Sequence, residues 1–479
     1  PPAQTATEVT SDDGRGGVAT VRYEFGGGLH DRVERRFLGF RFEKQTQPCV
    51  EGEARCPFVE IEYRQDLAAA SKPERIDEYA GDGELLRSRI LEYTTNDDVV
   101  PRTALTTGIW QHTLGAADAE CPGPQCKRTY THRGFDAYGE MTWETDHGDY
   151  DAEGDEDTTL TTFVPNTDAY IVDKPARQVV VAGVDEGGDR LLETRWTYDG
   201  ADDWQVAPSA GLETTEARWA SQADDFVETH MEYDDWGNVT AQIDEVGART
   251  EHTFDDTHHL FEVSTTNALG QATHTEWDTV CGAPAATLGL NGERTTLTYD
   301  PLCRMTEKRE PNGRIERHAW VDLDDASVQH ERIEVLAAED AEPQWQRRHF
   351  DGLGRTWREV QRGPDAQTGD IYTDTTYDVR GNPSATTRPY YWAADGPAEP
   401  VIHATVTDYD ALDRPIRVTF PDGAFTTKRY GVWSVTETDE LGRSKTDHFD
   451  ADQRRVAHEE TVGGEVHATT YVYDRRGNL

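Results

Sequence analysis

The chain has 479 residues, of which 92 are Asp or Glu and 47 are Lys or Arg, so its formal net charge is −45. This excess of acid argues against nucleic-acid binding, which needs a basic face that displaces counterions from phosphate groups. No apolar run approaches the roughly 18 residues of a membrane-spanning helix, and 12 Trp, 19 Tyr and 14 Phe argue against the disorder that high charge suggests.

Two pairs of cysteines lie close together in the first part of the chain, Cys49 with Cys56 and Cys121 with Cys126. A third pair, Cys281 and Cys303, follows later. An even number with local spacing predicts three disulfide bonds and an oxidising destination. A zinc site is the weaker alternative, because no Cys-x-x-Cys occurs and no His residues flank the pairs at zinc-finger spacing.

An acidic segment, Asp146–Asp157, carries the only pattern that resembles a metal site. Asp149, Asp151 and Glu153 imitate the start of a calcium loop, but Leu160 stands where an EF-hand needs its bidentate Glu. We therefore expect a solvated acidic loop, and a looser calcium site stays as the alternative. No other cofactor or metal is predicted.

From about residue 130 a motif recurs: an aromatic residue, Asp, two variable residues, a turn residue, then Asn or Arg. Clear copies begin at Tyr233, Tyr299, Phe350, Tyr377, Tyr409, Phe449 and Tyr473, and weaker copies begin at Phe135, Tyr198, Phe254 and Trp277. The spacing is about 22 residues. A second turn signal, such as the Asp-Glu-Val-Gly of 244–247, lies halfway along each unit, so one unit reads as strand, turn, strand, turn.

The strands of these units alternate as half-buried strands do, for example with Val239, Ala241 and Ile243 on one face. A hairpin unit cannot bury that face alone, so the units should stack laterally into one long, curling antiparallel sheet. The fold class is therefore all-β. The best helix candidate, residues 332–348, is interrupted by Pro343.

The motif residues are predicted to act in structure and not in catalysis. The aromatic residue should be a buried anchor, the Asp should accept backbone N–H bonds in a tight turn, and the Gly should allow a positive φ. The residues with this role are Tyr233, Asp234, Gly237, Tyr299, Asp300, Phe350, Asp351, Gly354, Tyr377, Asp378, Gly381, Tyr409, Asp410, Phe449, Asp450, Tyr473 and Asp474.

Cys281 and Cys303 occupy the turn position where other copies place Gly. This suggests a covalent link between neighbouring turns. Equivalent turns lie two strands apart, about 9–10 Å at ideal sheet spacing, whereas a disulfide needs Cα atoms within about 4.4–6.8 Å. The two turns would have to lean together.

The sequences YDDWGN (233–238), YDVRGN (377–382) and YDRRGN (473–478) resemble the YD repeats of Rhs proteins. Upstream, residues 22–42, with 63–66 and 79–83, resemble the segment that precedes the repeats in Tc-toxin B components and SpvB-like proteins. This resemblance divides the chain into a pre-repeat β region, 1–129, and a YD-repeat array, 130–479, that ends inside a repeat. It implies a hollow shell whose wall is a spiralling sheet.

The resemblance also implies a function. We expect a non-catalytic wall segment of a secreted or cell-surface polymorphic toxin, which encloses a C-terminal effector. Its partners would be its own effector domain or a toxin-complex partner, with a cell-surface receptor or glycan as further candidates, and no nucleic acid. The self-cleavage aspartates of Rhs toxins and any effector would lie beyond residue 479, and a β-propeller would lie upstream.

Two other functions compete with this one. The first is an adhesion or surface-recognition protein, as in the related teneurins or a glycan-binding protein, for which Trp392 and Trp433 are candidate exposed aromatics. The second is a hydrolase hidden in the acidic background. The sequence has no HExxH, no GxSxG, no phosphate-binding glycine loop and no dinucleotide fingerprint, so we assign no catalytic or cofactor-binding residue.

Overall fold

The structure is a computed structural model that describes residues 5–479 except 116–120, 122, 124, 366–367 and 394–401. Within this part every regular element is a β-strand, so the all-β prediction is confirmed. The best helix candidate, 332–348, forms no helix: it spans most of β25 (His330–Leu336), the turn after it and the start of β26 (Gln344–Phe350), and the two strands pair antiparallel. Ile333 and Val335 alternate with charged residues there, which is a strand pattern. No helix long and apolar enough to cross a membrane occurs among the described residues.

The strands are short and follow one another without long excursions. The first nine are β1 (Glu8–Asp12), β2 (Val18–Gly26), β3 (His30–Asp31), β4 (Arg36–Phe37), β5 (Phe42–Thr46), β6 (Phe58–Tyr63), β7 (Pro73–Tyr79), β8 (Leu85–Asn96) and β9 (Thr103–Leu114). The next group is β10 (Cys126–Phe135), β11 (Met141–Asp149), β12 (Asp157–Phe163), β13 (Pro175–Ala182), β14 (Arg190–Tyr198), β15 (Glu213–Ala220), β16 (Asp225–Tyr233), β17 (Val239–Ile243), β18 (Arg249–Phe254), β19 (Glu262–Thr266), β20 (Ala272–Asp278), β21 (Ala283–Leu288), β22 (Arg294–Tyr299), β23 (Met305–Arg309) and β24 (Ile315–Val321). After β25 and β26 come β27 (Thr356–Gln361), β28 (Asp370–Tyr377), β29 (Pro383–Thr387), β30 (Tyr390–Trp392), β31 (Ala404–Tyr409), β32 (Pro415–Thr419), β33 (Phe425–Gly431), β34 (Ser434–Thr438), β35 (Ser444–Phe449), β36 (Arg455–Val462) and β37 (Glu465–Thr470).

Within the described residues, 35 of these strands form one antiparallel sheet, and β3 and β4 form a separate hairpin. Almost every strand pairs with the strand before it and the strand after it in sequence. One exception is β2, which pairs with β5 past the β3–β4 hairpin. The others surround β30: the first half of β28 pairs with β30 and its second half with β29, and β29 pairs with β31 past β30. The boundary between the two predicted sequence regions, at 129/130, falls inside β10, so both regions share this sheet.

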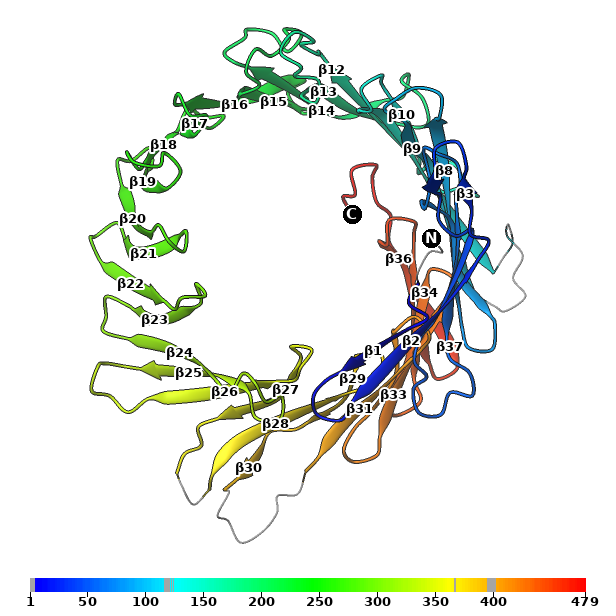
Figure 1. Cartoon of the computed structure of the whole chain (residues 1–479), viewed down its shortest axis with the longest axis vertical. Coiled ribbons are helices and arrows are strands. Elements are labelled where there is room, and N and C mark those ends of the chain that lie inside the picture. Colours follow the sequence, from blue (N-terminus) through cyan, green and yellow to red (C-terminus); the bar gives the residue numbers. More distant parts are fainter. Residues whose placement is uncertain (1–4, 116–120, 122, 124, 366–367, 394–401) are drawn as a thin grey trace.

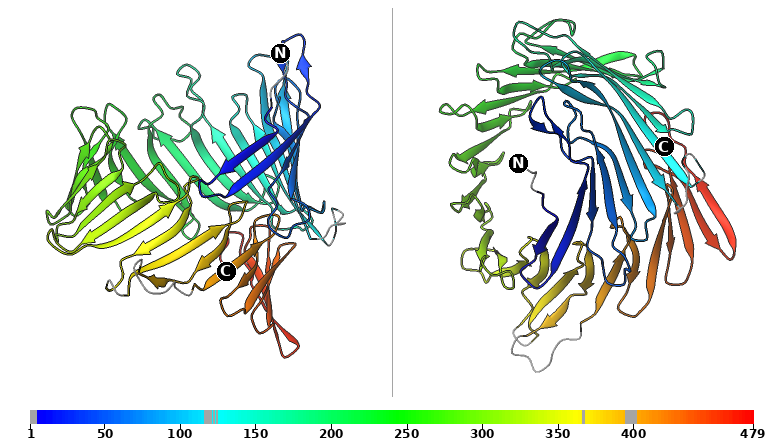
Figure 2. Two further views of the ribbon diagram at one scale, coloured as in Figure 1. Left: turned by 60° about the horizontal axis from the view of Figure 1, so that its bottom comes forward. Right: turned by 45° about the vertical axis from the view of Figure 1, so that its right-hand side comes forward.

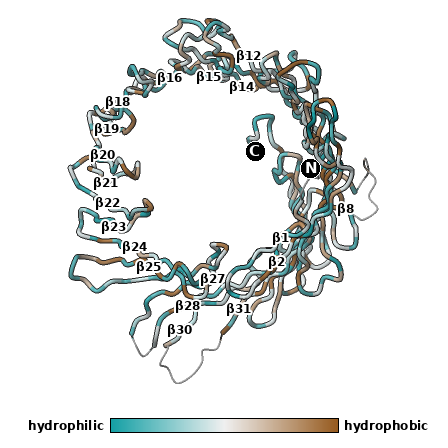
Figure 3. The backbone as a smooth tube through the Cα atoms, in the orientation of Figure 1, coloured by the Kyte–Doolittle hydropathy of each residue, from teal (hydrophilic) through white to brown (hydrophobic). Residues whose placement is uncertain are grey.

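The sheet curls into a ring and then continues past its own beginning (Figure 1). The last strands, β31–β37, run beneath the first ones, β1–β9, in a second level of the wall (Figure 2). A right-handed twist that accumulates from strand to strand produces such curling. Hydrophilic and hydrophobic residues are mixed along the whole ring, with no continuous apolar belt (Figure 3). Its buried apolar residues, such as Ala241, Ile315 and Val360, are therefore scattered along a single layer.

The wall has two rims, because every strand ends in a turn at each edge of the sheet. We call the edge that holds the motif turns the motif rim; it includes 234–238, 278–282, 300–304, 351–355, 378–382, 450–454 and 474–478. The other edge is the opposite rim; it includes 13–17, 47–57, 150–156, 221–224, 244–248, 267–271 and 289–293.

Candidate functional site: the seam between two levels of the wall

Each clear motif copy builds the same turn. At Asp234, carboxylate Oδ1 accepts the backbone N–H groups of Trp236 and Asn238, both at 2.9 Å. Gly237 has φ 87°, where a side chain would be strained. The Asn238 amide and these N–H groups hold the pKa of Asp234 below its usual value. The same two N–H bonds form at Asp300, Asp351, Asp378, Asp410, Asp450 and Asp474.

The motif tyrosines do more than fill space. The hydroxyl of Tyr233 donates a hydrogen bond of 2.6 Å to the carbonyl of Glu213, and Tyr377 donates one of 2.6 Å to the carbonyl of Thr356. Tyr299, Tyr409 and Tyr473 bond earlier carbonyls in the same way. Each hydroxyl therefore bonds the first or second residue of an earlier strand and connects the motif turn to that strand. Sequence reasoning gave the tyrosines an apolar role only, and the preference for Tyr over Phe was the signal that could have revealed the bond.

All six cysteines are bonded, in the three predicted pairs. Cys49 and Cys56 close the loop between β5 and β6, and Cys121 bonds Cys126 at the start of β10. Cys281 and Cys303 join two motif turns, with their Cα atoms 5.3 Å apart. This distance lies well below the spacing of strands two apart. The two turns therefore lean together beyond the ends of their strands.

The two levels of the wall meet where the motif rim of the later strands touches the opposite rim of the earlier ones. We call this contact the seam. At its beginning the backbone N–H of Gly352 donates to the carbonyl of Asp13 at 2.7 Å. The guanidinium of Arg355 lies 3.6 Å from the Asp13 carboxylate, and that of Arg15 stacks 3.5 Å from the ring centre of Trp357.

Arg380 is the most enclosed of the arginines that form ion pairs across the seam. Its side chain is only 3% exposed and lies 3.0 Å from Glu53 on the opposite rim and 3.2 Å from Asp413 in the next motif turn. It also donates to the carbonyl of Asp410 at 3.3 Å. Glu53 sits in the loop that the Cys49–Cys56 bond closes, and its carboxylate accepts the backbone N–H of Val50 at 3.0 Å. The Cys49–Cys56 disulfide closes this loop and so restricts the position of Glu53, the partner of Arg380.

The far end of the seam uses the acidic segment that resembled a calcium loop. Arg475 donates to the carbonyl of Glu156 at 2.9 Å and lies 3.5 Å from the Asp157 carboxylate. Arg476 donates to the hydroxyl of Ser221 at 2.6 Å. Burial raises the pKa of Asp157. The charge of Arg475 lowers this pKa and that of Asp452 raises it further.

Most of the remaining carboxylates of that segment are bonded within the protein. Asp149 pairs with Lys127, Asp151 pairs with Arg128, and Asp155 accepts the backbone N–H of Asp149 at 2.8 Å. Among the described residues no group of three or more His, Cys, Asp or Glu side chains is placed to hold a metal ion.

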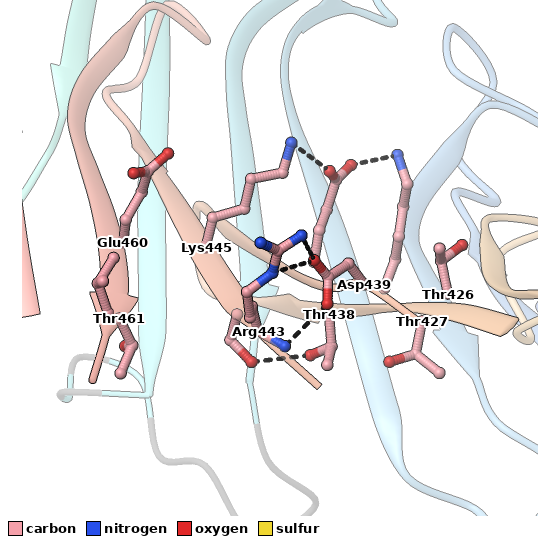
Figure 4. A pocket seen from close by; sticks show the side chains of 12 residues that line it. Thr426, Thr427, Thr438, Asp439, Arg443, Lys445, Glu460 and Thr461 are labelled. Atoms are coloured by element: carbon pink, nitrogen blue, oxygen red, sulfur yellow. Dashed lines mark hydrogen bonds and ion pairs between the residues drawn. The ribbon is translucent and has the colours of Figure 1, made fainter. Parts of the chain in front are cut away.

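A hollow lies on β33–β36 (Figure 4). Its charges are matched: Glu437 lies 2.6 Å from Lys428 and 2.9 Å from Lys445, and Asp439 lies 2.6 Å from Arg443. Hydroxyl side chains such as Thr426, Thr427 and Thr438 complete the lining. This pairing leaves the lining a neutral, hydroxyl-rich surface.

The two tryptophans that were candidate exposed aromatics are half-buried, so that expectation is corrected. The ring of Trp392 lies 5.3 Å from that of Tyr372. The ammonium of Lys127 lies 5.1 Å from the ring centre of Trp433, which places Trp433 at the seam. Each ring is partly covered by a neighbour: that of Trp392 by Tyr372 on an adjacent strand, and that of Trp433 by Lys127 on the other level of the wall.

Comparisons with known proteins agree with this architecture. Residues 1–65 match the family model of the insecticide toxin TcdB middle/N-terminal region, and residues 233–278 match that of the RHS repeat. No curated protein sequence matches the chain significantly.

Solved structures match over nearly the whole chain. The crystal structure of TcdB2-TccC3 matches 96% of this chain with a TM-score of 0.75 at 12% identity, which covers 34% of that chain. TcdB2-TccC3-Cdc42 matches 96% with a TM-score of 0.74 at 11% identity and 36% coverage of that chain. A Photorhabdus luminescens Tc holotoxin pore, with a substitution in TccC3, matches 96% with a TM-score of 0.74 at 12% identity and 35% coverage. The chain thus has the fold of about a third of these proteins.

Proposed function

We propose that this chain is a wall segment of the hollow shell of a secreted Tc-type toxin, and that the shell encloses an effector. The observation that carries this proposal is the seam. A single sheet curls through a full ring and then contacts its own first strands through residues such as Asp13, Glu53, Ser221, Arg380 and Arg476. A second level stacked on the first gives the wall a continuous side, which a container requires.

The comparisons support the same proposal. The matches to the TcdB region and to the RHS repeat fall in the two parts of the chain that the sequence divided at 129/130. The solved relatives with this fold are complexes of TcdB2 with TccC3, one of them in a holotoxin pore. We accordingly assign a toxin-complex partner and secretion to this chain. The wall would act by exclusion, and its own residues would perform no catalysis.

The proposal is tested by protease protection in the assembled toxin complex. The effector should survive a protease dose that degrades it when free. Opening the seam with Arg380→Glu, which sets a third carboxylate beside those of Glu53 and Asp413, should expose the effector and shorten its lifetime about tenfold. Equal digestion of free and assembled effector would refute the proposal.

A further inference from the structure

Two of the three disulfide bonds are unsuited to control the seam. Cys281–Cys303 joins the turns after β20 and β22, which belong to one level of the wall. Cys121–Cys126 lies at the start of β10, beside the seam contact of Lys127, but Cys126 is only 3% exposed. Reduction of the first bond would leave the seam unchanged, and burial shields the second from a thiol in solution.

The Cys49–Cys56 bond has both access and position. Both cysteines are half-buried, and the loop between them has exposed residues at 51, 52, 54 and 55. This loop carries Glu53, whose carboxylate lies 3.0 Å from the guanidinium of Arg380 on the other level of the wall. One half-buried disulfide thus supports the loop that makes the most enclosed ion pair across the seam.

Reduction would lengthen the free part of this loop. The strands β5 and β6 end in a backbone hydrogen bond of 2.9 Å, from Gln47 to the carbonyl of Pro57. The disulfide closes the loop a second time, nearer its tip. Two hydrogen bonds between Val50 and Glu53, of 3.0 and 3.2 Å, lie within the tip, so they hold its shape and not its place. A longer free loop samples more conformations, and Glu53 would then spend less time at Arg380.

Arg380 depends on Glu53 because its side chain is only 3% exposed. An enclosed cation is unfavourable when it loses a partner, since it has left its water behind. Without Glu53, the guanidinium would keep the Asp413 carboxylate at 3.2 Å and the Asp410 carbonyl at 3.3 Å, both from its own level. Arg380 would then be held by its own level alone, and the ion pair across the seam would be lost.

We propose that the Cys49–Cys56 bond is a redox latch on the seam, which holds the two levels together at Arg380 when oxidised and releases them there when reduced. A thiol reductant supplies two electrons and two protons, so that the S–S bond becomes two Cys thiols and the reductant becomes a disulfide. The latch rests on the proposed function, since it regulates the container: a shell closed in an oxidising medium opens at this point in a reducing one.

The test treats the full chain, in its toxin complex, with dithiothreitol, which is oxidised to its cyclic disulfide. Amide hydrogen exchange at 378–382 should accelerate about tenfold. Alkylation of Cys49 and Cys56, followed by mass measurement, verifies that their bond is open. Replacing both residues by Ser should give the fast exchange without reductant and remove the response to it.

The matched control replaces Cys281 and Cys303 by Ser. Exchange at 378–382 should respond to dithiothreitol in this variant as it does in the unaltered chain. Glu53→Ala keeps the Cys49–Cys56 bond and removes only the partner of Arg380, so it should give fast exchange at 378–382 even when oxidised.

Three results would overturn the latch. The first is slow exchange at 378–382 after the Cys49–Cys56 bond has been shown to be open. The second is loss of the response in the Cys281 and Cys303 variant, because the seam would then depend on another bond. The third is acceleration over the whole chain, which would mean general unfolding.

Effector protection without reductant tests the proposed function alone. Loss of protection there would refute that function. Intact protection together with unresponsive exchange at 378–382 would refute the latch and leave the function standing.

Discussion

The seam and the open arc, strands β16–β23, are built from the same repeat but held together differently. In the seam, turns from two levels interlock through Arg380, Arg355 and Arg476, and their tips are partly covered. In the open arc each motif turn stands on its own Asp. The hydroxyls of Tyr233 and Tyr299 hold two of these turns as well, and the Cys281–Cys303 bond joins two of them. The difference teaches that one motif can serve as a self-sufficient turn or as half of an interface, depending on whether a second level of the wall lies against it.

The largest test of this comparison removes the central seam residue. Arg380→Ala leaves the Glu53 and Asp413 carboxylates without their shared cation. Because these carboxylates are partly exposed to water, the loss should cost about 1.5–3 kcal/mol, as for hydrogen bonds to a charged group. Amide hydrogen exchange should accelerate in 47–57 and 378–382 and stay unchanged in the open arc. Arg443→Ala is the control, because the Arg443 side chain is 70% exposed and its pair with Asp439 should contribute less than about 1 kcal/mol. Equal effects of the two variants would contradict the distinction.

The second test addresses the open arc. Replacing both Cys281 and Cys303 by Ser should destabilise this region by about 2–4 kcal/mol, because the bond restricts the unfolded chain. Faster exchange should be confined to 278–304, and the seam should keep its protection. The exposed neighbour Val280→Ser serves as the control. An effect that spreads to the seam would show that the two regions are coupled and would weaken the comparison.

The smallest test uses pH, because the two regions should respond with opposite sign. Asp157 and Asp452, at the far end of the seam, have raised pKa values, chiefly because they are buried. Repulsion from nearby Asp146, Asp155 and Asp450 raises these pKa values further, and attraction to Arg454 and Arg475 lowers them. A carboxylate with a raised folded-state pKa gains stability as pH falls toward its unfolded value, 3.8. In the open arc Asp234 and Asp300 have lowered pKa values, so their contribution persists above 3.8 and is lost below it.

The measurement is amide exchange, corrected for the intrinsic rate, between about pH 6 and about pH 4.5. Protection at 150–157 and 450–454 should rise a few-fold, while that of 234–238 and 300–304 stays level. Asp452→Asn should remove much of the rise. A fall in protection at the seam over this range would contradict the prediction, because lowered carboxylates such as Asp13 lose their contribution only below 3.8.

Most of the fold could be predicted from the sequence because its signals are local. Alternation gives the strands, Gly and Asn mark the turns, and the recurrence of the motif shows that strands pair with their neighbours. Even the Cys281–Cys303 bond followed from two substitutions at one motif position, although ideal sheet geometry argued against it. The stretch 332–348 failed because its many charged residues hid the alternation of Ile333 and Val335.

The seam could not be predicted in this way. Arg380 and Glu53 are separated by 327 residues, and no periodicity in the sequence fixes after how many strands a curling sheet meets its own edge. That number depends on the sum of many small twists. The charge of the acidic segment Asp146–Asp157 is evident in the sequence, but the sequence could not show which residues of the second level contact it. For the same reason Trp433 was expected at the surface and lies at the seam.

The order of strands in this wall has a mechanical consequence. Because nearly every strand pairs only with its neighbours in sequence, tension applied at Leu479 would load one hairpin at a time, starting with β36 and β37. The chain would come away like a zipper, in steps of similar size, with higher force where Arg476 and Arg380 hold the levels together and where Cys281–Cys303 blocks extension. A wall of this kind can be undone from its end without melting the remainder.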